Sequence, residues 1–105
     1  MSKIKVQLDD GGFIFFDRDK ALECWDEGAW WDGSNNISLA TRSQWEHEIL
    51  YKTSKGRYVL QSWSQWESTP DSYQILTPKE AAVWLLTNEH DVPADLSKHV
   101  DHLIE

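Results

Sequence analysis

The four residues Ser-Gln-Trp-Glu occur twice in the chain, at 43–46 and at 64–67, on either side of a turn signal at Gly56. The sequence Thr53-Ser54-Lys55-Gly56 fits a three-residue hairpin loop with Gly56 in the left-handed bulge position, so that Thr53 faces Arg57. Because side chains alternate along a strand, this turn fixes the register of both arms. A central antiparallel hairpin is therefore predicted.

The predicted register divides the hairpin side chains between two faces. The more apolar face holds the facing pairs Tyr51 and Val59, Ile49 and Gln61, His47 and Trp63, and Trp45 and Gln65. The other face is mixed and more polar, with Gln44, Glu46, Glu48, Leu50 and Lys52 against Tyr58, Leu60, Ser62, Ser64 and Trp66. Trp45 is thus expected to pack in the core with Trp63, whereas Trp66 points to the other face.

The segments before this hairpin predict a second hairpin, a short helix and a further strand. Alternating apolar residues over 4–8, a turn at 9–12 and an apolar run over 13–16 favour two paired strands. Ala21, Leu22 and Trp25 lie at helical spacing and predict a helix over 18–27, with Asp17 as its N-cap and Gly28 as a left-handed stop. Alternation over 37–41 indicates another strand.

The C-terminal segments predict a brief extended stretch over 73–75 and two helices. Thr77-Pro78-Lys79-Glu80 is a capping box that starts a helix running to Asn88, and Pro93 opens a last helix. The expected fold class is α+β, in which one early helix and two C-terminal helices pack on one face of an antiparallel sheet of four or five strands. At 105 residues the chain is expected to form a single domain over 1–105.

The charge of the chain is strongly acidic and unevenly spread. Its formal net charge is −8, and the central segment 41–67 is near-neutral, with three acidic against four basic residues. So few cations disfavour direct nucleic-acid binding, which relies on Lys and Arg to neutralise phosphates. A single cysteine, Cys24, and an N-terminal segment without a long apolar stretch favour a reducing cytoplasm and no membrane association.

The binding candidates are aromatic and polar residues that the register leaves on the mixed face, together with the Trp pair before it. The candidate residues are Trp66, Trp30, Trp31, Gln44 and Tyr58. An exposed indole can stack on a sugar, a base or a proline, and Trp is enriched at interaction hot spots. Alternatively, Trp66 packs under a helix or under the Trp30-Trp31 segment. One of Trp30 and Trp31 is expected to point inward and the other outward.

Catalytic and metal-binding residues are not assigned, and no cofactor is expected. The strand register places His47 on the opposite face from its neighbours Glu46 and Glu48, which argues against a local His–carboxylate pair. The segment 89–91 (Glu-His-Asp) with His99 and His102 could hold a divalent ion, but the spacing matches no closed site. The phosphate-binding glycine loop, the nucleophile elbow and paired cysteines are missing from the sequence.

The stretches 42–48, 50–53, 59–60, 63–66 and 80–85, with Gly56 between them, resemble a group of small bacterial proteins without an assigned activity, some of them on mobile elements. The resemblance covers roughly residues 30–95, and Trp63-Ser64-Gln65-Trp66 is its distinctive part. The chain departs from the pattern at Tyr58, where the group would have Trp. The resemblance implies one bacterial domain and no particular site.

Acidic charge, abundant tryptophan and the lack of catalytic motifs favour a non-enzymatic interaction module. Its expected partner is a basic or nucleic-acid-binding protein, and an inhibitor or antitoxin-like role is one specific form of this hypothesis. The alternatives are a module that stacks a planar ligand on exposed tryptophans and a metal-dependent hydrolase. A homodimer formed by pairing of edge strands is a further alternative.

Overall fold

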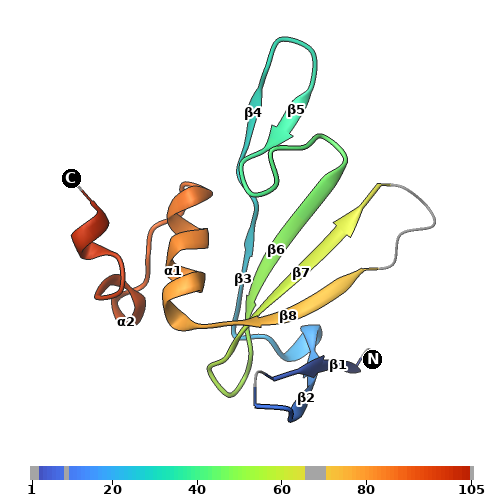
Figure 1. The fold of residues 1–105 in the computed structure, drawn as a ribbon, viewed down its shortest axis with the longest axis vertical. Coiled ribbons are helices and arrows are strands. Elements are labelled where there is room, and N and C mark those ends of the chain that lie inside the picture. Colours follow the sequence, from blue (N-terminus) through green and yellow to red (C-terminus); the bar gives the residue numbers. More distant parts are fainter. Residues whose placement is uncertain (1–2, 9, 66–70, 105) are drawn as a thin grey trace.

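The computed structural model describes residues 3–8, 10–65 and 71–104, and it is mostly β (Figure 1). Its eight described strands are β1 (Lys3–Gln7), β2 (Phe13–Asp17), β3 (Glu23–Asp26), β4 (Ala29–Trp31), β5 (Asn36–Ser38), β6 (Glu46–Lys52), β7 (Tyr58–Ser64) and β8 (Ser72–Leu76). The helical elements are α1 (Pro78–Thr87), the four-residue α2 (Ala94–Ser97), and the 3₁₀ turns η1 (Arg18–Lys20) and η2 (Asp101–Leu103).

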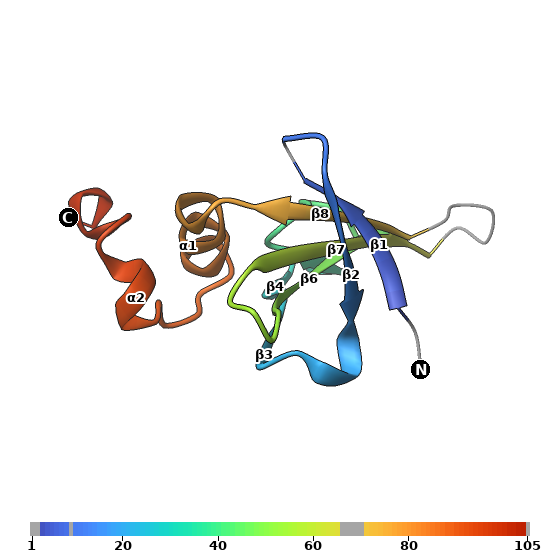
Figure 2. The ribbon, with the colours of Figure 1, turned by 90° about the horizontal axis from the view of Figure 1, so that it is seen from below.

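The strands form three antiparallel sheets. The main sheet has the order β3-β6-β7-β8, while β1 pairs with β2 and β4 pairs with β5 in separate two-stranded ribbons. In Figures 1 and 2 the helices and the β1–β2 hairpin lie at opposite sides of the main sheet, and the β4–β5 ribbon extends from one end of it. Each two-stranded ribbon must be held by contacts to the main sheet, because an isolated hairpin is marginal in water.

The prediction of an α+β domain with one early and two C-terminal helices on one face is wrong. Residues 18–27 form a 3₁₀ turn and strand β3, which pairs with β6 so that Trp25 faces Leu50. This pairing satisfies backbone groups along β6 that a helix would leave open. The predicted last helix is limited to the short α2 and η2, because the backbone at Val100 (φ −130°) departs from helical geometry.

The central hairpin has the predicted register. Tyr51 faces Val59 and His47 faces Trp63, and the Gln65 amide donates to the Trp45 carbonyl at 2.9 Å. The Thr53 amide donates to the Arg57 carbonyl at 2.7 Å, and Gly56 has φ +86°. The β1–β2 hairpin, strand β8 and the α1 capping box are also confirmed, the last by the Glu80 amide donating to Thr77 Oγ1 at 3.1 Å.

Both faces of the central hairpin are buried. The face predicted to be mixed carries the larger core, in which Leu50, Tyr58 and Leu60 pack with buried residues of β8, α1 and the C-terminal segment. On the other face, Tyr51 and Val59 pack with Val6 and Phe16 of the β1–β2 hairpin. Burying one such large apolar side chain contributes roughly 1.5–3 kcal/mol, so these two cores hold the helices and the N-terminal hairpin onto the sheet.

Gly28 connects β3 to β4 at a close contact with the end of α1. Its amide donates to the Asn88 Oδ1 atom at 2.9 Å, and the Asn88 side chain in turn donates to the Trp84 carbonyl at 2.8 Å. Gly28 does not have the positive φ of a left-handed helix stop, contrary to the sequence-based prediction. A Cβ atom there would lie 2.6 Å from Leu39 Cδ1 and 2.9 Å from the Asn88 carbonyl oxygen.

Replacing Gly28 with alanine should therefore lower the free energy of unfolding by about 1–3 kcal/mol, because the backbone of Asn88 cannot move away cheaply. Urea unfolding followed by tryptophan fluorescence measures this change. Gly12→Ala is the matched control, because its Cβ would meet only side-chain atoms, Asp10 Oδ1 at 3.1 Å and Leu8 Cδ1 at 3.7 Å, and no backbone. Equal stabilities of the two variants would contradict the close-contact explanation.

Tyr58 makes the free energy of unfolding depend on pH in the alkaline range. Burial, the nearby Asp95 carboxylate and the hydrogen bond of the hydroxyl to Asp95 raise the pKa of Tyr58 to about 12 from its ordinary value of 10.0. Between these two pH values the unfolded chain releases a proton that the folded protein keeps, so the free energy of unfolding falls as the pH rises. Below pH 10 this contribution is complete.

The Tyr58→Phe variant should show a smaller loss of stability between about pH 9 and about pH 11 than the unmodified protein. Some loss will remain, because burial also raises the pKa values of Tyr51 and Tyr73. Urea unfolding of both proteins at the two pH values gives the comparison. An identical pH dependence of the two proteins would show that Tyr58 is not the residue responsible.

Candidate functional site

The exposed tryptophans gather around the β4–β5 ribbon and the loop that follows it. Exposed fractions are 40% for Trp30, 63% for Trp31 and 44% for Trp45, and we call these three residues the tryptophan end. Trp30 faces Ile37 and Trp31 faces Asn36 across the ribbon, so their side chains lie on opposite faces. Both are exposed because the two-stranded ribbon extends beyond the main sheet (Figure 1), contrary to the one-in, one-out prediction.

The other predicted binding residues are placed differently. Tyr58 is only 4% exposed and packs in the core against Trp25, so it does not belong to an open surface. Gln44 is half-buried beside Trp45, and Trp66 lies outside the described residues. Trp45 itself is exposed and is not among the core residues, so the prediction that it packs in the core with Trp63 is wrong. Trp63 instead lies beside His47, with ring centroids 5.6 Å apart.

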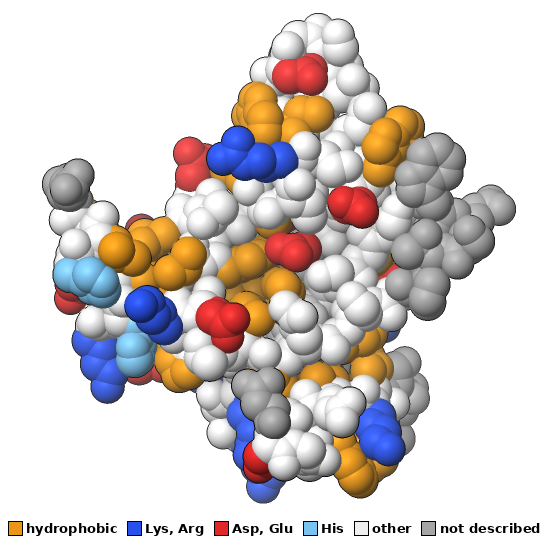
Figure 3. Space-filling view, viewed as in Figure 1, with side chains coloured by type: hydrophobic (Ala, Val, Ile, Leu, Met, Phe, Trp, Pro, Cys, Tyr) orange, Lys and Arg blue, Asp and Glu red, His pale blue; other side chains and the backbone are white. Residues whose placement is uncertain are grey.

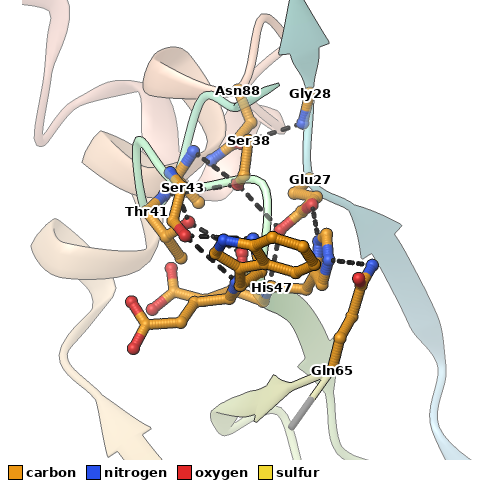
Figure 4. Close-up of polar contacts among 12 residues, drawn as sticks. Glu27, Gly28, Ser38, Thr41, Ser43, His47, Gln65 and Asn88 are labelled. Carbon is orange, nitrogen blue, oxygen red and sulfur yellow. Dashed lines mark hydrogen bonds and ion pairs between the residues drawn. The ribbon is translucent and has the colours of Figure 1, made fainter. Parts of the chain in front are cut away.

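One carboxylate, that of Glu27, connects the tryptophan end to the main sheet (Figure 4). Glu27 Oε2 lies 2.6 Å from His47 Nδ1 on β6, and Glu27 Oε1 accepts hydrogen bonds from Ser38 Oγ at 2.8 Å and from the Glu48 amide at 2.7 Å. The side chains of His47 and Glu27 are 19% and 14% exposed. Hydrogen bonds to a charged, largely buried carboxylate are stronger than hydrogen bonds between neutral groups. Glu27 therefore holds the β4–β5 ribbon against β6.

Ser38 extends this network into the loop that carries Trp45. The buried Ser38 Oγ atom accepts hydrogen bonds from the amides of Ala40 at 3.1 Å and Thr41 at 3.2 Å. The Thr41 hydroxyl donates to the Glu46 carbonyl at 2.8 Å, and Ser43 Oγ accepts from the Trp45 amide at 3.0 Å. The Ser43 amide donates to Thr41 Oγ1 at 3.2 Å, so a continuous series of hydrogen bonds that begins at Glu27 holds the backbone at Trp45.

The Glu27–His47 pair does not have the arrangement of a catalytic triad. Gln65 Nε2 lies 3.0 Å from His47 Nε2, so with Nδ1 donating to Glu27 both ring nitrogens are engaged within the described structure. Ser38 donates to the carboxylate rather than to the imidazole, whereas a triad places the nucleophile on the histidine. Sequence reasoning missed this pair because it placed Glu27 in a helix and considered only the neighbours of His47.

Other candidate reactive groups are dispersed over the described residues. No three His, Cys, Asp or Glu side chains among them lie close enough to hold a metal ion. His90 Nε2 contacts the Asp26 carbonyl, and its ring stacks on Trp84 with centroids 6.2 Å apart. Burial and the Asp26 carboxylate raise the pKa of the Cys24 thiol, which favours the less reactive protonated form.

Two hollows lie side by side on the α1 face of the sheet, next to the tryptophan end. The apolar one has a volume of about 390 Å³ and includes Leu60, Leu76, Val83 and Trp84 in its lining. The smaller one, about 280 Å³, is lined mainly by polar residues, including Glu46, Glu48 and Ser62. Ala40 and Thr41, which are adjacent in the loop, line one hollow each. Figure 3 shows hydrophobic side chains in this region with acidic side chains around them.

The comparisons with known proteins give no match to this arrangement. No model of a protein family matches the chain, and neither a curated protein nor a solved structure is significantly similar to it. The resemblance described from the sequence therefore stays a prediction. In the described part of the chain, no helix has the length and apolar character needed to cross a membrane.

Glu27→Ala should lower the free energy of unfolding by about 2 kcal/mol or more, because it leaves donors on His47, Ser38 and Glu48 without their acceptor. Chemical unfolding gives this value, and tryptophan fluorescence of the folded variant should also change as Trp45 loses its fixed position. Glu46→Ala is the matched control, since it removes the same charge from an exposed side chain nearby. A control as destabilised as Glu27→Ala would argue against the network.

Proposed function

We propose that the protein is a non-enzymatic cytoplasmic interaction module that binds a basic protein partner through the tryptophan end and the adjoining apolar hollow. The observation that carries the proposal is the exposure of three tryptophans on one projecting end, 63% in the case of Trp31. Large exposed aromatic surface is costly in water, and Trp is the residue type most enriched at binding hot spots.

The charge around this surface supports a basic partner. Between residues 26 and 46 the chain has four acidic residues and one basic residue, and the acidic side chains of Asp26, Asp32 and Glu46 are exposed. The amides of Asn35 and Ser34 hydrogen-bond the Asp32 carboxylate and lower its pKa, which keeps it charged. Negative charge beside an apolar surface attracts Lys- and Arg-rich surfaces and speeds their encounter.

The hydrogen-bond network around Glu27 and His47 supports a role in binding rather than in catalysis. Its polar groups satisfy one another, with Glu27 holding three donors and His47 held on both ring nitrogens. Such a network holds a surface in one conformation, which reduces the entropy lost when a partner binds. An inhibitor or antitoxin of a basic, nucleic-acid-binding protein is the specific form of this function that we propose.

Affinity capture from the source cells, followed by titration of the captured protein, tests the proposal. The partner should be basic, and its binding should weaken as salt is raised. Trp31→Ala should weaken binding by about 2 kcal/mol or more, which is about 30-fold in Kd, as at other interface hot spots. Because Trp31 is exposed, this variant should stay folded, which circular dichroism checks.

Ile104→Ala is the matched control, since Ile104 is 60% exposed but lies near the C-terminus. It should leave the affinity unchanged. Capture of no basic protein, or equal affinities of the Trp31 and Ile104 variants, would overturn the proposal. If instead a small planar ligand quenches tryptophan fluorescence and Trp31→Ala abolishes the quenching, the end is a stacking platform and not a protein interface.

A further inference from the structure

A second candidate site is a cavity far from the tryptophan end, between the β1–β2 hairpin and the turn that joins β6 to β7. Its volume is about 570 Å³. Strand β2 forms one wall and the turn residues 53–57 contribute to the other, and Figure 1 shows both at the opposite end of the main sheet from β4–β5. Pockets for small ligands range over about 300–1,000 Å³, so this cavity has the size of a ligand site.

Four basic side chains line this cavity: Lys3, Lys20, Lys55 and Arg57. All four are exposed, and none of them forms an ion pair within the described residues, whose two ion pairs lie elsewhere. The chain has only ten Lys and Arg residues and a net charge of −8, so a cavity lined by four cations and one carboxylate, that of Asp17, has a charge opposite to that of the whole chain. Such a concentration of positive charge favours an anionic ligand.

The β2 wall adds an aromatic corner. Phe13 and Phe15 are 52% and 63% exposed, and their rings meet edge to face with centroids 5.6 Å apart and an interplanar angle of 82°. The ammonium group of Lys5 lies 4.3 Å from the centroid of the Phe13 ring. A flat ring that stacks on one phenylalanine would meet the edge of the other, a favourable geometry for aromatic groups. The cavity therefore suits a ligand with both a ring and a negative charge.

Asp17 provides the third feature of the cavity. Its Oδ1 atom accepts a hydrogen bond from the Asp19 amide at 3.0 Å, whereas Oδ2 is buried and has no hydrogen-bond partner among the described residues. A buried carboxylate oxygen that accepts no hydrogen bond destabilises the fold, and such oxygens are rare in native structures. Asp17 lines the cavity, and a small turn of its side chain would bring Oδ2 within reach of an N–H group of a bound ligand.

We propose that this cavity binds a free purine mononucleotide. The basic side chains Lys3, Lys20, Lys55 and Arg57 hold the phosphate, the Phe13–Phe15 corner stacks the base, and Asp17 accepts a hydrogen bond from a base N–H. These three chemistries occur together in a nucleotide. A long nucleic-acid strand is disfavoured, because the net charge of −8 would repel the phosphates outside the cavity.

Isothermal titration calorimetry of the full chain with GMP tests the proposal. Guanosine, which lacks the phosphate, and ribose 5-phosphate, which lacks the base, are titrated for comparison. GMP should bind with Kd below about 1 mM. Each of these two compounds should bind about tenfold more weakly or worse, because each lacks either the charged or the stacking contact. Arg57→Glu and Phe15→Ala should each weaken GMP binding by about tenfold or more.

Lys98→Glu and Val83→Ala are the matched controls, as both alter exposed residues away from the cavity by a comparable change. They should bind GMP like the unmodified protein, and Trp31→Ala should do the same, which separates this proposal from the protein-binding one. Absence of GMP binding, equal binding of ribose 5-phosphate, or equal loss in Lys98→Glu and Arg57→Glu would overturn the proposal. Tighter binding of a single-stranded oligoribonucleotide than of GMP would overturn the assignment to a free nucleotide.

Discussion

The central β6–β7 hairpin has to be covered on both of its faces, and the rest of the structure meets this requirement. Leu50 and Val59 are both fully buried, yet they point to opposite sides of the sheet. A sheet with two apolar faces needs a layer on each side. Helix α1 supplies one layer and the β1–β2 hairpin the other, while β3 and β8 pair with the open edges of β6 and β7.

This arrangement leaves two ends of the molecule with different chemistry. At one end the β4–β5 ribbon projects beyond the core and presents indole rings among acidic side chains, held in place by the Glu27 carboxylate. At the other end, the β1–β2 hairpin and the β6–β7 turn enclose a cavity with basic and phenylalanine side chains. The two ends share no residues, so the two proposed ligands, a protein partner and a small anion, would be bound by separate surfaces of this small protein.

The sequence predicted the elements whose signals are local. The Gly56 turn fixed the register of the central hairpin, and the Thr77–Glu80 capping box located the start of α1, because both depend on hydrogen bonds between residues a few positions apart. The same reasoning failed for residues 18–27. Their apolar spacing fits a helix, but a short helix is marginal by itself, and as a strand the segment covers the open edge of β6. No residue pattern within the segment indicates that this edge is there.

By itself, then, the sequence determined the central hairpin, the N-terminal hairpin and the start of α1, together with an acidic charge and an excess of tryptophan. Only the tertiary structure decided which residues meet across long distances. Glu27 and His47 are 20 residues apart, and Tyr58 and Asp95 are 37 apart. Likewise, exposure of Trp31 and burial of Tyr58 depend on which strands have neighbours. Contacts of this kind are set by how the sheet is covered, a property of the assembled layers rather than of any local stretch of sequence.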